Sequence, residues 1–256
     1  MMADLPDLLE LATAAARRAG AFLRKTAKSP IAVTAELERD VKLAADKGSE
    51  EIIVPLLREG SNFAILSEEM GLNDSRDSFT GPYWLVDPLD GSLNYLQGIP
   101  LCCVSIGLWE GHEPLLGVVY DFNREELFKG IPGQGAWLND KPIQVSVTRE
   151  VKKAMLCTGF PANTDYSPKA LLQFVDQVRK YKKLRLLGSA ALSLAYVAAG
   201  RADGYFERDI KIWDVGAGMA LVRAAGGITV QTASPKPGAV TVYGGNRLLP
   251  NIEMIS

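Results

Sequence analysis

The spacing of hydrophobic residues predicts helices at the start of the chain. Between residues 4 and about 26, apolar residues recur every three or four positions, which is typical of an amphipathic helix. Residues 27–40 lack this pattern and are predicted to form a loop or an irregular hairpin, with a weak strand at 31–33. A second helix is expected from Ser49 to Leu57, because Ser49 can cap it and glutamates follow in its first turn.

Short apolar runs separated by turn residues dominate the next part of the chain and predict strands. The first run, 63–66, leads into two glutamates, and a polar loop is expected at 71–82. A second run, 83–86, stops abruptly at Asp87. The later runs predict a meander of antiparallel strands at 102–109, 115–121, 126–128, 135–138 and 143–146.

Strands and helices alternate after residue 154, which is typical of an α/β unit. The expected strands lie at 154–158, 183–187, 202–207 and 228–230. The expected helices lie at 168–182, 190–199 and 212–225. The pattern therefore predicts an N-terminal α+β half, residues 1–146, followed by a C-terminal α/β half, residues 147–256.

Composition and charge narrow the class of protein. The 256 residues are 47% hydrophobic and carry a formal net charge of −2, without the basic stripe that a nucleic-acid-binding protein usually has. We therefore expect no nucleic-acid partner. No apolar span reaches 18 residues and the acidic N-terminus lacks the basic region of a signal peptide, so we expect a soluble cytoplasmic protein without membrane contact.

The rare residue types exclude several kinds of chemistry. His112 is the only histidine and lies in an apparent hairpin turn, which argues against serine–histidine–aspartate catalysis and excludes zinc sites with several histidines. The three cysteines, Cys102, Cys103 and Cys157, form no CxxC pair. They are expected to be buried, reduced thiols.

Acidic residues gather where apolar runs end, at Asp46, Glu68, Glu69, Asp87, Asp90 and Asp214. Taken singly, Asp214 is most simply a helix cap, and the two glutamates a solvated turn. Asp87 and Asp90, however, end a hydrophobic strand together, where two like charges are costly without a cation. Carboxylate oxygens suit a hard divalent cation. The glycine and serine that follow can begin a helix, so we interpret this stretch as a metal site facing a phosphate site.

These motifs resemble those of a known family. Asp87-Pro88-Leu89-Asp90-Gly91-Ser92-Leu93-Asn94-Tyr95 resembles the inositol monophosphatase signature D-P-[IL]-D-G-T-x-N-F. Trp213 to Gly218, continuing to Ala225-Gly226-Gly227, resembles the second signature, W-D-x-A-A-G through E-A-G-G, and Ser67-Glu68-Glu69 resembles the G-E-E element. Asp46 fits the upstream aspartate. The resemblance spans nearly the whole chain and identifies it with the lithium-sensitive, magnesium-dependent phosphomonoesterases.

The resemblance implies a fold, a cofactor and a set of metal ligands. The fold would be the layered αβαβα sandwich of the inositol monophosphatase and fructose-1,6-bisphosphatase type, a mixture of α+β and α/β, in a homodimer. Each site would hold two or three Mg²⁺ ions. The first would bind Glu68, Asp87 and the Leu89 carbonyl, and the second Asp87, Asp90 and Asp214. Glu68 would also help to place a weaker third ion through waters.

The resemblance also implies catalytic and substrate-binding roles. Asp46 would accept a hydrogen bond from the Ser92 hydroxyl, and this pair would take a proton from the attacking water, with Glu68 as the other catalytic carboxylate. Glu69 would lie behind the metal ligands or share a metal through water. Substrate contacts would come from residues of both halves, namely Asp90, Gly91, Ser92, Gly188, Ser189, Ala190, Glu207 and Asp214.

The chain departs from the family pattern at several positions. Ser92 replaces the usual threonine but keeps the hydroxyl, and Ser67 replaces a glycine. Gly216 replaces an alanine and Ala224 a glutamate. Lys42-Leu43 replaces the usual V-T ahead of the upstream aspartate, which leaves metal affinity and lithium sensitivity open.

Several activities remain open at this point, with inositol monophosphate the favoured substrate. A fructose-1,6-bisphosphatase or dual-activity enzyme would need further cations, for which Arg185, Arg208 and Lys211 are candidates, although ordinary surface charge is the simpler interpretation. Activity on 3′-phosphoadenosine 5′-phosphate is disfavoured, because that branch usually has Lys-Glu-Phe where this chain has Leu93-Asn94-Tyr95. Histidinol phosphate is a further alternative. A non-catalytic binding relative is disfavoured because every expected acidic ligand is present.

Overall fold

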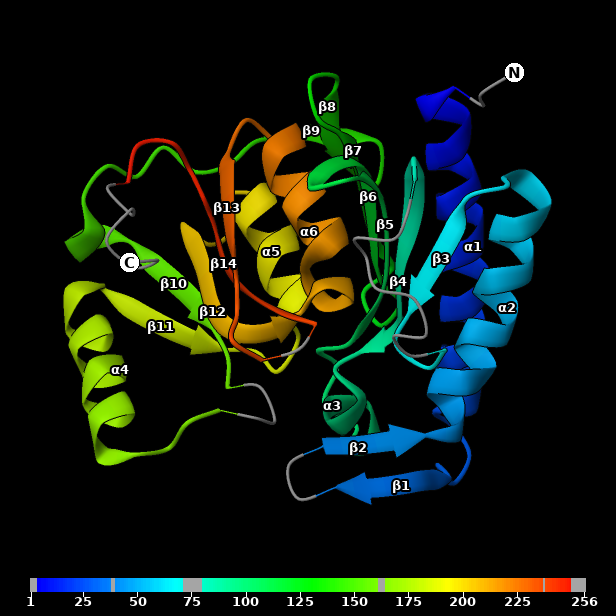
Figure 1. Cartoon of the computed structure of the whole chain (residues 1–256), viewed down its shortest axis with the longest axis horizontal. Helices are drawn as coiled ribbons and strands as arrows, with labels where there is room; N and C mark the ends of the chain where they lie inside the picture. Colours follow the sequence, from blue (N-terminus) through cyan, green and yellow to red (C-terminus); the bar gives the residue numbers. More distant parts are fainter. Residues whose placement is uncertain (1–3, 38–39, 71–79, 161–163, 237, 250–256) are drawn as a thin grey trace.

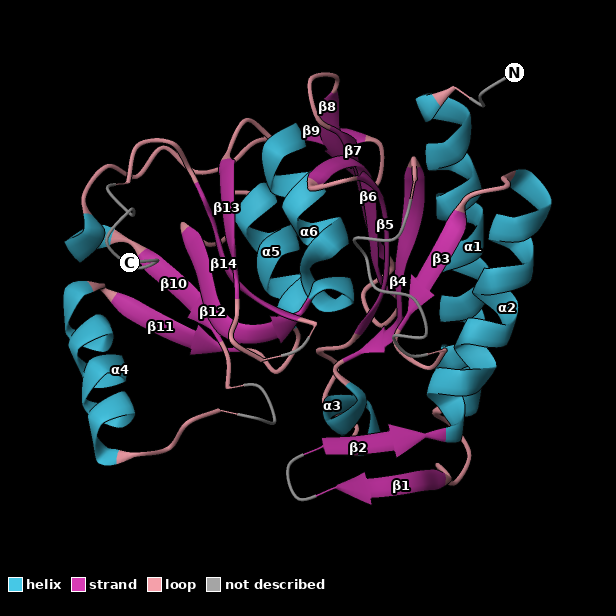
Figure 2. Ribbon diagram, viewed as in Figure 1, coloured by secondary structure: helices cyan, strands magenta, loops and turns pink. Residues whose placement is uncertain are grey.

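Helices and sheets alternate in five layers across the molecule (Figure 1). The computed structural model describes residues 4–37, 40–70, 80–160, 164–236 and 238–249. Helices α1 (Leu5–Thr26) and α2 (Ala44–Gly60) cover a seven-stranded sheet (Figure 2). Helices α5 (Ala190–Ala198) and α6 (Ile212–Ala224) lie between this sheet and a five-stranded sheet, and α4 (Pro168–Lys180) lies on the far side of the five-stranded sheet. This is the expected αβαβα sandwich. Within the described residues, no helix is long and apolar enough to cross a membrane.

The N-terminal layer contains α1 (Leu5–Thr26) and α2 (Ala44–Gly60), joined by a hairpin of β1 (Val33–Leu37) and β2 (Asp40–Leu43). The weak strand predicted at 31–33 was therefore placed too early. The predicted start of the second helix at Ser49 is wrong by five residues, because the Asp46 carboxylate accepts a hydrogen bond from the Leu43 N–H and closes the first turn there. Ser49 is buried inside α2, where its hydroxyl donates to the Pro88 carbonyl.

Most of the predicted meander is confirmed in the seven-stranded sheet, whose strands follow one another in space in chain order. The last strand, predicted at 143–146, was placed too late, because the strand there ends at residue 143 and the Val145 N–H donates to the Ala225 carbonyl instead. Only the first pair is parallel. The strands are β3 (Ala64–Ser67), β4 (Pro82–Asp90), β5 (Cys103–Glu110), β6 (Glu113–Asp121), β7 (Glu126–Ile131), β8 (Gly135–Leu138) and β9 (Lys141–Ile143). His112 lies in the exposed turn between β5 and β6, as expected. Most of the polar loop predicted at 71–82 lies outside the described residues.

The five-stranded sheet has the order β11-β10-β12-β14-β13 and is mixed. Its first three strands run parallel, as the α/β pattern predicted, and the last two pair antiparallel. The strands are β10 (Met155–Thr158), β11 (Lys183–Leu186), β12 (Gly204–Lys211), β13 (Ile228–Ala233) and β14 (Ala239–Gly245). No strand was predicted at β14, although the buried Val240 and Val242 alternate there as strand residues do.

The remaining helices begin at recognisable caps or turns. Helix α5 begins after Ser189, whose hydroxyl accepts a hydrogen bond from the Leu192 N–H at 3.2 Å. Ser167 caps α4 in the same way. The helices are α3 (Ser92–Leu96), α4 (Pro168–Lys180), α5 (Ala190–Ala198), α6 (Ile212–Ala224) and the short 3₁₀ helix η2 (Val151–Lys153).

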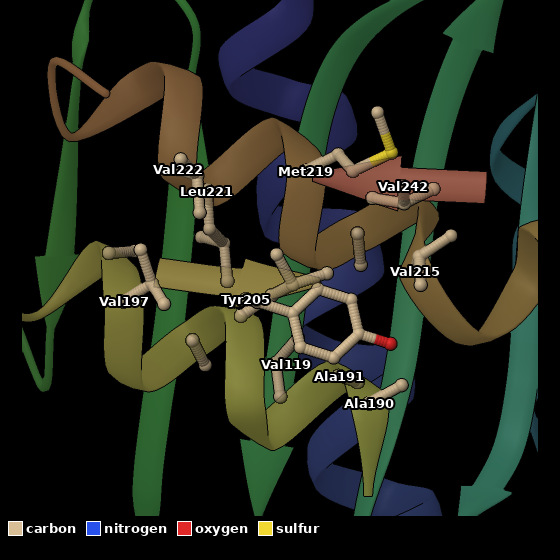
Figure 3. Packing of buried hydrophobic residues seen from close by; sticks show 14 of the residues in the cluster. Val119, Ala190, Ala191, Val197, Tyr205, Val215, Met219, Leu221, Val222 and Val242 are labelled. Carbon is tan, nitrogen blue, oxygen red and sulfur yellow. The ribbon is translucent and has the colours of Figure 1, made fainter. Parts of the chain in front are cut away.

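The central helices join the two halves through one hydrophobic core. Val119 of β6, Tyr205 of β12 and Val242 of β14 meet the apolar faces of α5 and α6 in this core (Figure 3). Helix α6 packs very close to the first sheet, because a Cβ at Gly117 would lie 2.2 Å from the Ala217 carbonyl oxygen. The shared core fixes the strand ends of one sheet relative to those of the other, which is what a site built from both halves requires.

Candidate active site

Most of the predicted site residues line one cavity of about 420 Å³ between the two halves of the chain. They come from the end of β4, the turn after β3, the start of α3, the loop before α5, β12 and the first turn of α6. The predicted residues that line it are Glu68, Asp87, Leu89, Asp90, Gly91, Ser92, Gly188, Ser189, Ala190, Glu207 and Asp214. Asp46 and Glu69 lie behind this lining rather than in it.

A one-residue shift in strand register brings Asp87 and Asp90 together. Residues three positions apart in a regular strand point to opposite faces of the sheet. Against β5, however, Asp87 pairs with Ser105 and Asp90 pairs with Cys103, so β4 carries one extra residue between them. This bulge coincides with Pro88, which cannot donate to the ladder. It returns the Asp90 side chain to the side occupied by Asp87.

Asp90 also ties the first half of the chain to the second. Its carboxylate accepts hydrogen bonds from the Ser189 hydroxyl at 2.5 Å and from the backbone N–H groups of Ala191 at 2.7 Å and Ala190 at 3.3 Å. These donors form the N-terminal end of α5, where the helix dipole favours a negative charge. Asp90 therefore fixes the position of residues 188–190 relative to β4.

The acidic side chains of the cavity repel one another. Burial is the main cause that raises the pKa of Asp87 and of Asp214, and nearby carboxylates, Glu68 first, raise both further. Burial also raises the pKa of Asp90, although its hydrogen bonds to α5 oppose the shift. Because all the donors are oxygens and their charges are poorly compensated, this set of side chains fits a hard divalent cation.

The side chains do not surround a single point. Among the described residues, no three histidine, cysteine or acidic side chains are arranged so that they could together hold one ion. The Asp90 carboxylate accepts hydrogen bonds from the N–H groups of α5 instead.

The hydrogen bond expected between Asp46 and Ser92 is present. The Ser92 hydroxyl lies 2.7 Å from Asp46 Oδ1 and 2.9 Å from the Leu89 carbonyl oxygen. Burial raises the pKa of Asp46 to about 6, more than its hydrogen bonds lower it. Ser92 lines the cavity whereas Asp46 does not, so the hydroxyl stands between the buried carboxylate and the space where a substrate would lie.

Glu207 supplies a polar group from the second sheet. Its side chain is buried, accepts a hydrogen bond from the Tyr205 hydroxyl at 2.8 Å, and has a pKa raised to about 8 mainly by burial. A Cβ on Gly159 would lie 2.5 Å from a Glu207 carboxylate oxygen, so a larger residue there would push this carboxylate aside. At neutral pH the protonated carboxyl can donate a hydrogen bond to a substrate hydroxyl.

Sequence reasoning missed part of the lining. Thr158 ends β10, and Gly159 and Phe160 follow it. Strand β10 lies beside β12 in parallel, so the carboxyl ends of the two strands share one edge of the sheet. Because ligand sites gather at the carboxyl ends of parallel strands, the sequence pattern could have indicated these residues. Of the three candidate cations, only Lys211 lines the cavity, while Arg208 lines a neighbouring cavity and Arg185 lines neither. Lys42 also lines it, although no role was predicted for this side chain.

Comparison with known proteins gives consistent results. The model of the inositol monophosphatase family matches residues 4–252. A Xylella fastidiosa protein named Nus factor SuhB is 43% identical over 217 residues, covering 83% of this chain and 78% of that protein. A Synechocystis protein named inositol-1-monophosphatase is 40% identical over 235 residues, covering 88% and 79%.

Solved structures have the same fold. The inositol monophosphatase of Anabaena superposes with a TM-score of 0.81 at 37% identity, covering 96% of this chain and 93% of that one. The Thermotoga maritima inositol monophosphatase gives a TM-score of 0.79 at 26% identity, covering 94% and 93%.

Proposed function

Because this chain belongs to the inositol monophosphatase family, we propose that it is a Mg²⁺-dependent phosphomonoesterase acting on a small polyol phosphate, with inositol monophosphate as the first candidate. The observation that carries the proposal is the cavity in which buried carboxylates of β4 and α6 face the Ser92 hydroxyl and its partner Asp46. Metal dependence is a property of the family. For this chain we propose that the ion is Mg²⁺ and that two or three ions bind in each site.

The residues of this chain have distinct tasks in the proposed reaction. Two or three Mg²⁺ ions, held by Glu68, Asp87, the Leu89 carbonyl, Asp90 and Asp214, would supply positive charge against the phosphate dianion and lower the pKa of a bound water. Ser92 accepts the proton of the attacking water while its own proton moves to Asp46, 2.7 Å away. The backbone N–H groups of Gly91 and Ser92 hold phosphate oxygens. Direct attack by water inverts phosphorus and leaves no phosphate bound to the protein.

The shape and polarity of the cavity favour a small polyol. Glu207 can donate to one hydroxyl and the loop at Gly188 can contact another. Of the three candidate cations only Lys211 lines the cavity, and the other lysine there, Lys42, is paired with Glu69, which gives a second phosphate little positive charge to bind. For this reason a fructose-1,6-bisphosphatase, or an enzyme with activity on both esters, stays the second candidate. The name Nus factor applies to the SuhB relatives, and our expectation of no nucleic-acid partner remains a prediction.

A panel of esters tests the proposed function. Phosphate release would be measured with inositol 1-phosphate, fructose 1,6-bisphosphate, 3′-phosphoadenosine 5′-phosphate and histidinol phosphate, each with Mg²⁺ and with EDTA. We expect hydrolysis only with Mg²⁺, the highest kcat/KM for inositol 1-phosphate, and no protein-bound phosphate after acid quenching. Lithium inhibition, expected of the family, can be measured in the same assay. Activity that persists in EDTA, or no activity on any ester, would contradict the proposal.

We also propose that the protein is a homodimer, because one face of the last layer is apolar and exposed. On α4, Leu171, Leu172 and Val175 are exposed, and so is Leu186 at the end of β11. Such a face on a single chain is a candidate for contact with a second copy. Light scattering coupled to size-exclusion chromatography should give a molar mass twice that of one chain. In Leu172→Glu the measured mass should fall toward that of a single chain. A wild-type monomer would contradict this proposal.

A further inference from the structure

One cation of this chain reaches the acidic side of the catalytic cavity. Lys42 Nζ lies 2.5 Å from Glu69 Oε1 and 3.9 Å from Glu68 Oε1. All three side chains are partly exposed, and Lys42 and Glu68 line the cavity. The Lys42 ammonium therefore lies close to a carboxylate that would also face a cation bound in the cavity.

The backbone explains why this side chain points to the cavity. Lys42 lies in β2 between Val41 and Leu43, both buried in the hydrophobic core between α1, α2 and the seven-stranded sheet. Because side chains alternate along a strand, the middle residue must face the other way. Its position is fixed by the pairing with Ala35 and by the Thr34 hydroxyl, which donates to the Lys42 carbonyl at 3.0 Å. A neutral residue here would leave both glutamates without this charge.

We propose that the Lys42 ammonium competes with a divalent ion for the Glu68 carboxylate. This competition lowers the affinity of the protein for its most weakly held divalent ion. The inference rests on the proposed function, since it takes Glu68 as a metal ligand. A fixed positive charge about 4 Å from a ligand oxygen repels an incoming ion, and the ion pair with Glu69 must be rearranged when the ion binds. Lys42 acts through Glu68 and Glu69 rather than on the substrate.

Mg²⁺ titration by calorimetry, at constant ionic strength and without substrate, tests the proposal. In Lys42→Met we expect the weakest Mg²⁺ binding step to become about tenfold tighter, because the competing charge is gone. Lys42→Arg keeps the charge and should bind Mg²⁺ as the wild type does. Lys129→Met is the matched control, since Lys129 forms ion pairs with Glu10 and Asp140 away from the cavity and its loss changes net charge equally.

The outcomes separate this inference from the proposed function. If wild type binds Mg²⁺ and hydrolyses an ester but Lys42→Met binds Mg²⁺ no more tightly, only the role of Lys42 is rejected. An equal gain in Lys129→Met would also reject it, because net charge would then be the cause. If neither wild type nor Lys42→Met binds Mg²⁺, both proposals fail together.

Discussion

Replacing Asp90 by Asn is expected to lower kcat/KM by about three orders of magnitude, because it removes a carboxylate that serves both the proposed metal site and the geometry of the cavity. Asp90 belongs to the buried acidic group with Asp87 and Asp214, so its loss removes one ligand charge. The same carboxylate accepts hydrogen bonds from Ser189 and Ala191. The Asn side chain keeps one acceptor oxygen, but its NH₂ group would face one of these donors and could not accept a hydrogen bond from it.

Phosphate release with Mg²⁺ and a Mg²⁺ titration measure this effect, and thermal unfolding reports whether the fold survives. Asp214→Asn is the informative companion, because it removes a carboxylate of the cavity without touching the bonds to α5. The same substitution at Asp140, which is exposed at the β8–β9 turn with a positive φ that Asn tolerates, should leave activity unchanged. Should Asp90→Asn keep a tenth or more of the wild-type activity, the assignment of this residue to the metal site would be wrong.

The succession of helices and strands could be predicted because its signals are local, whereas the αβαβα order of the layers was an expectation from the family resemblance. Helical periodicity in the first 26 residues and strand runs from 102 onward depend on neighbouring residues only. Most of these elements were predicted correctly, but β14 was missed and the run at 143–146 is strand only at residue 143. The start of α2 was missed because an apparent cap at Ser49 is overruled by the Asp46 carboxylate binding the Leu43 N–H, and by burial of Ser49 against β4. A local cap at Asp46 and a tertiary contact of Ser49 together place the start of α2 earlier than predicted.

The candidate site was predictable as a set of residue types but not as a geometry. Carboxylates after apolar runs indicated a cation site, and the resemblance to a family assigned each residue a role. The bulge between Asp87 and Asp90 depends on pairing with β5, and the bonds from Asp90 to α5 join residues about a hundred positions apart. The direction of the Lys42 side chain depends on which face of β2 the core covers. None of these can be read from a single segment.

Glu207→Gln is expected to stabilise the protein at alkaline pH, because the buried carboxyl must otherwise ionise without a counter-charge. Burial raises its pKa to about 8 from the ordinary glutamate value of 4.5, so the folded state holds the proton more tightly than the unfolded state does. This contribution to the free energy of unfolding is fully present below pH 4.5 and is lost as the pH rises toward 8. For this one group the loss is on the order of 3–5 kcal/mol. Glutamine stays neutral and can still accept the hydrogen bond from Tyr205.

Urea unfolding at several pH values between 5 and 9, in EDTA, measures the difference between the variant and the wild type. The other buried carboxylates also lower stability as the pH rises, but they are present in both proteins, so most of their contribution is common to the two. The variant should therefore gain stability relative to wild type progressively from pH 5 to pH 8. Glu59→Gln, at the exposed end of α2, controls for the substitution itself and should show no such trend. A difference that is flat with pH would mean that Glu207 is ionised in the folded protein, and its role as a hydrogen-bond donor to the substrate would have to be abandoned.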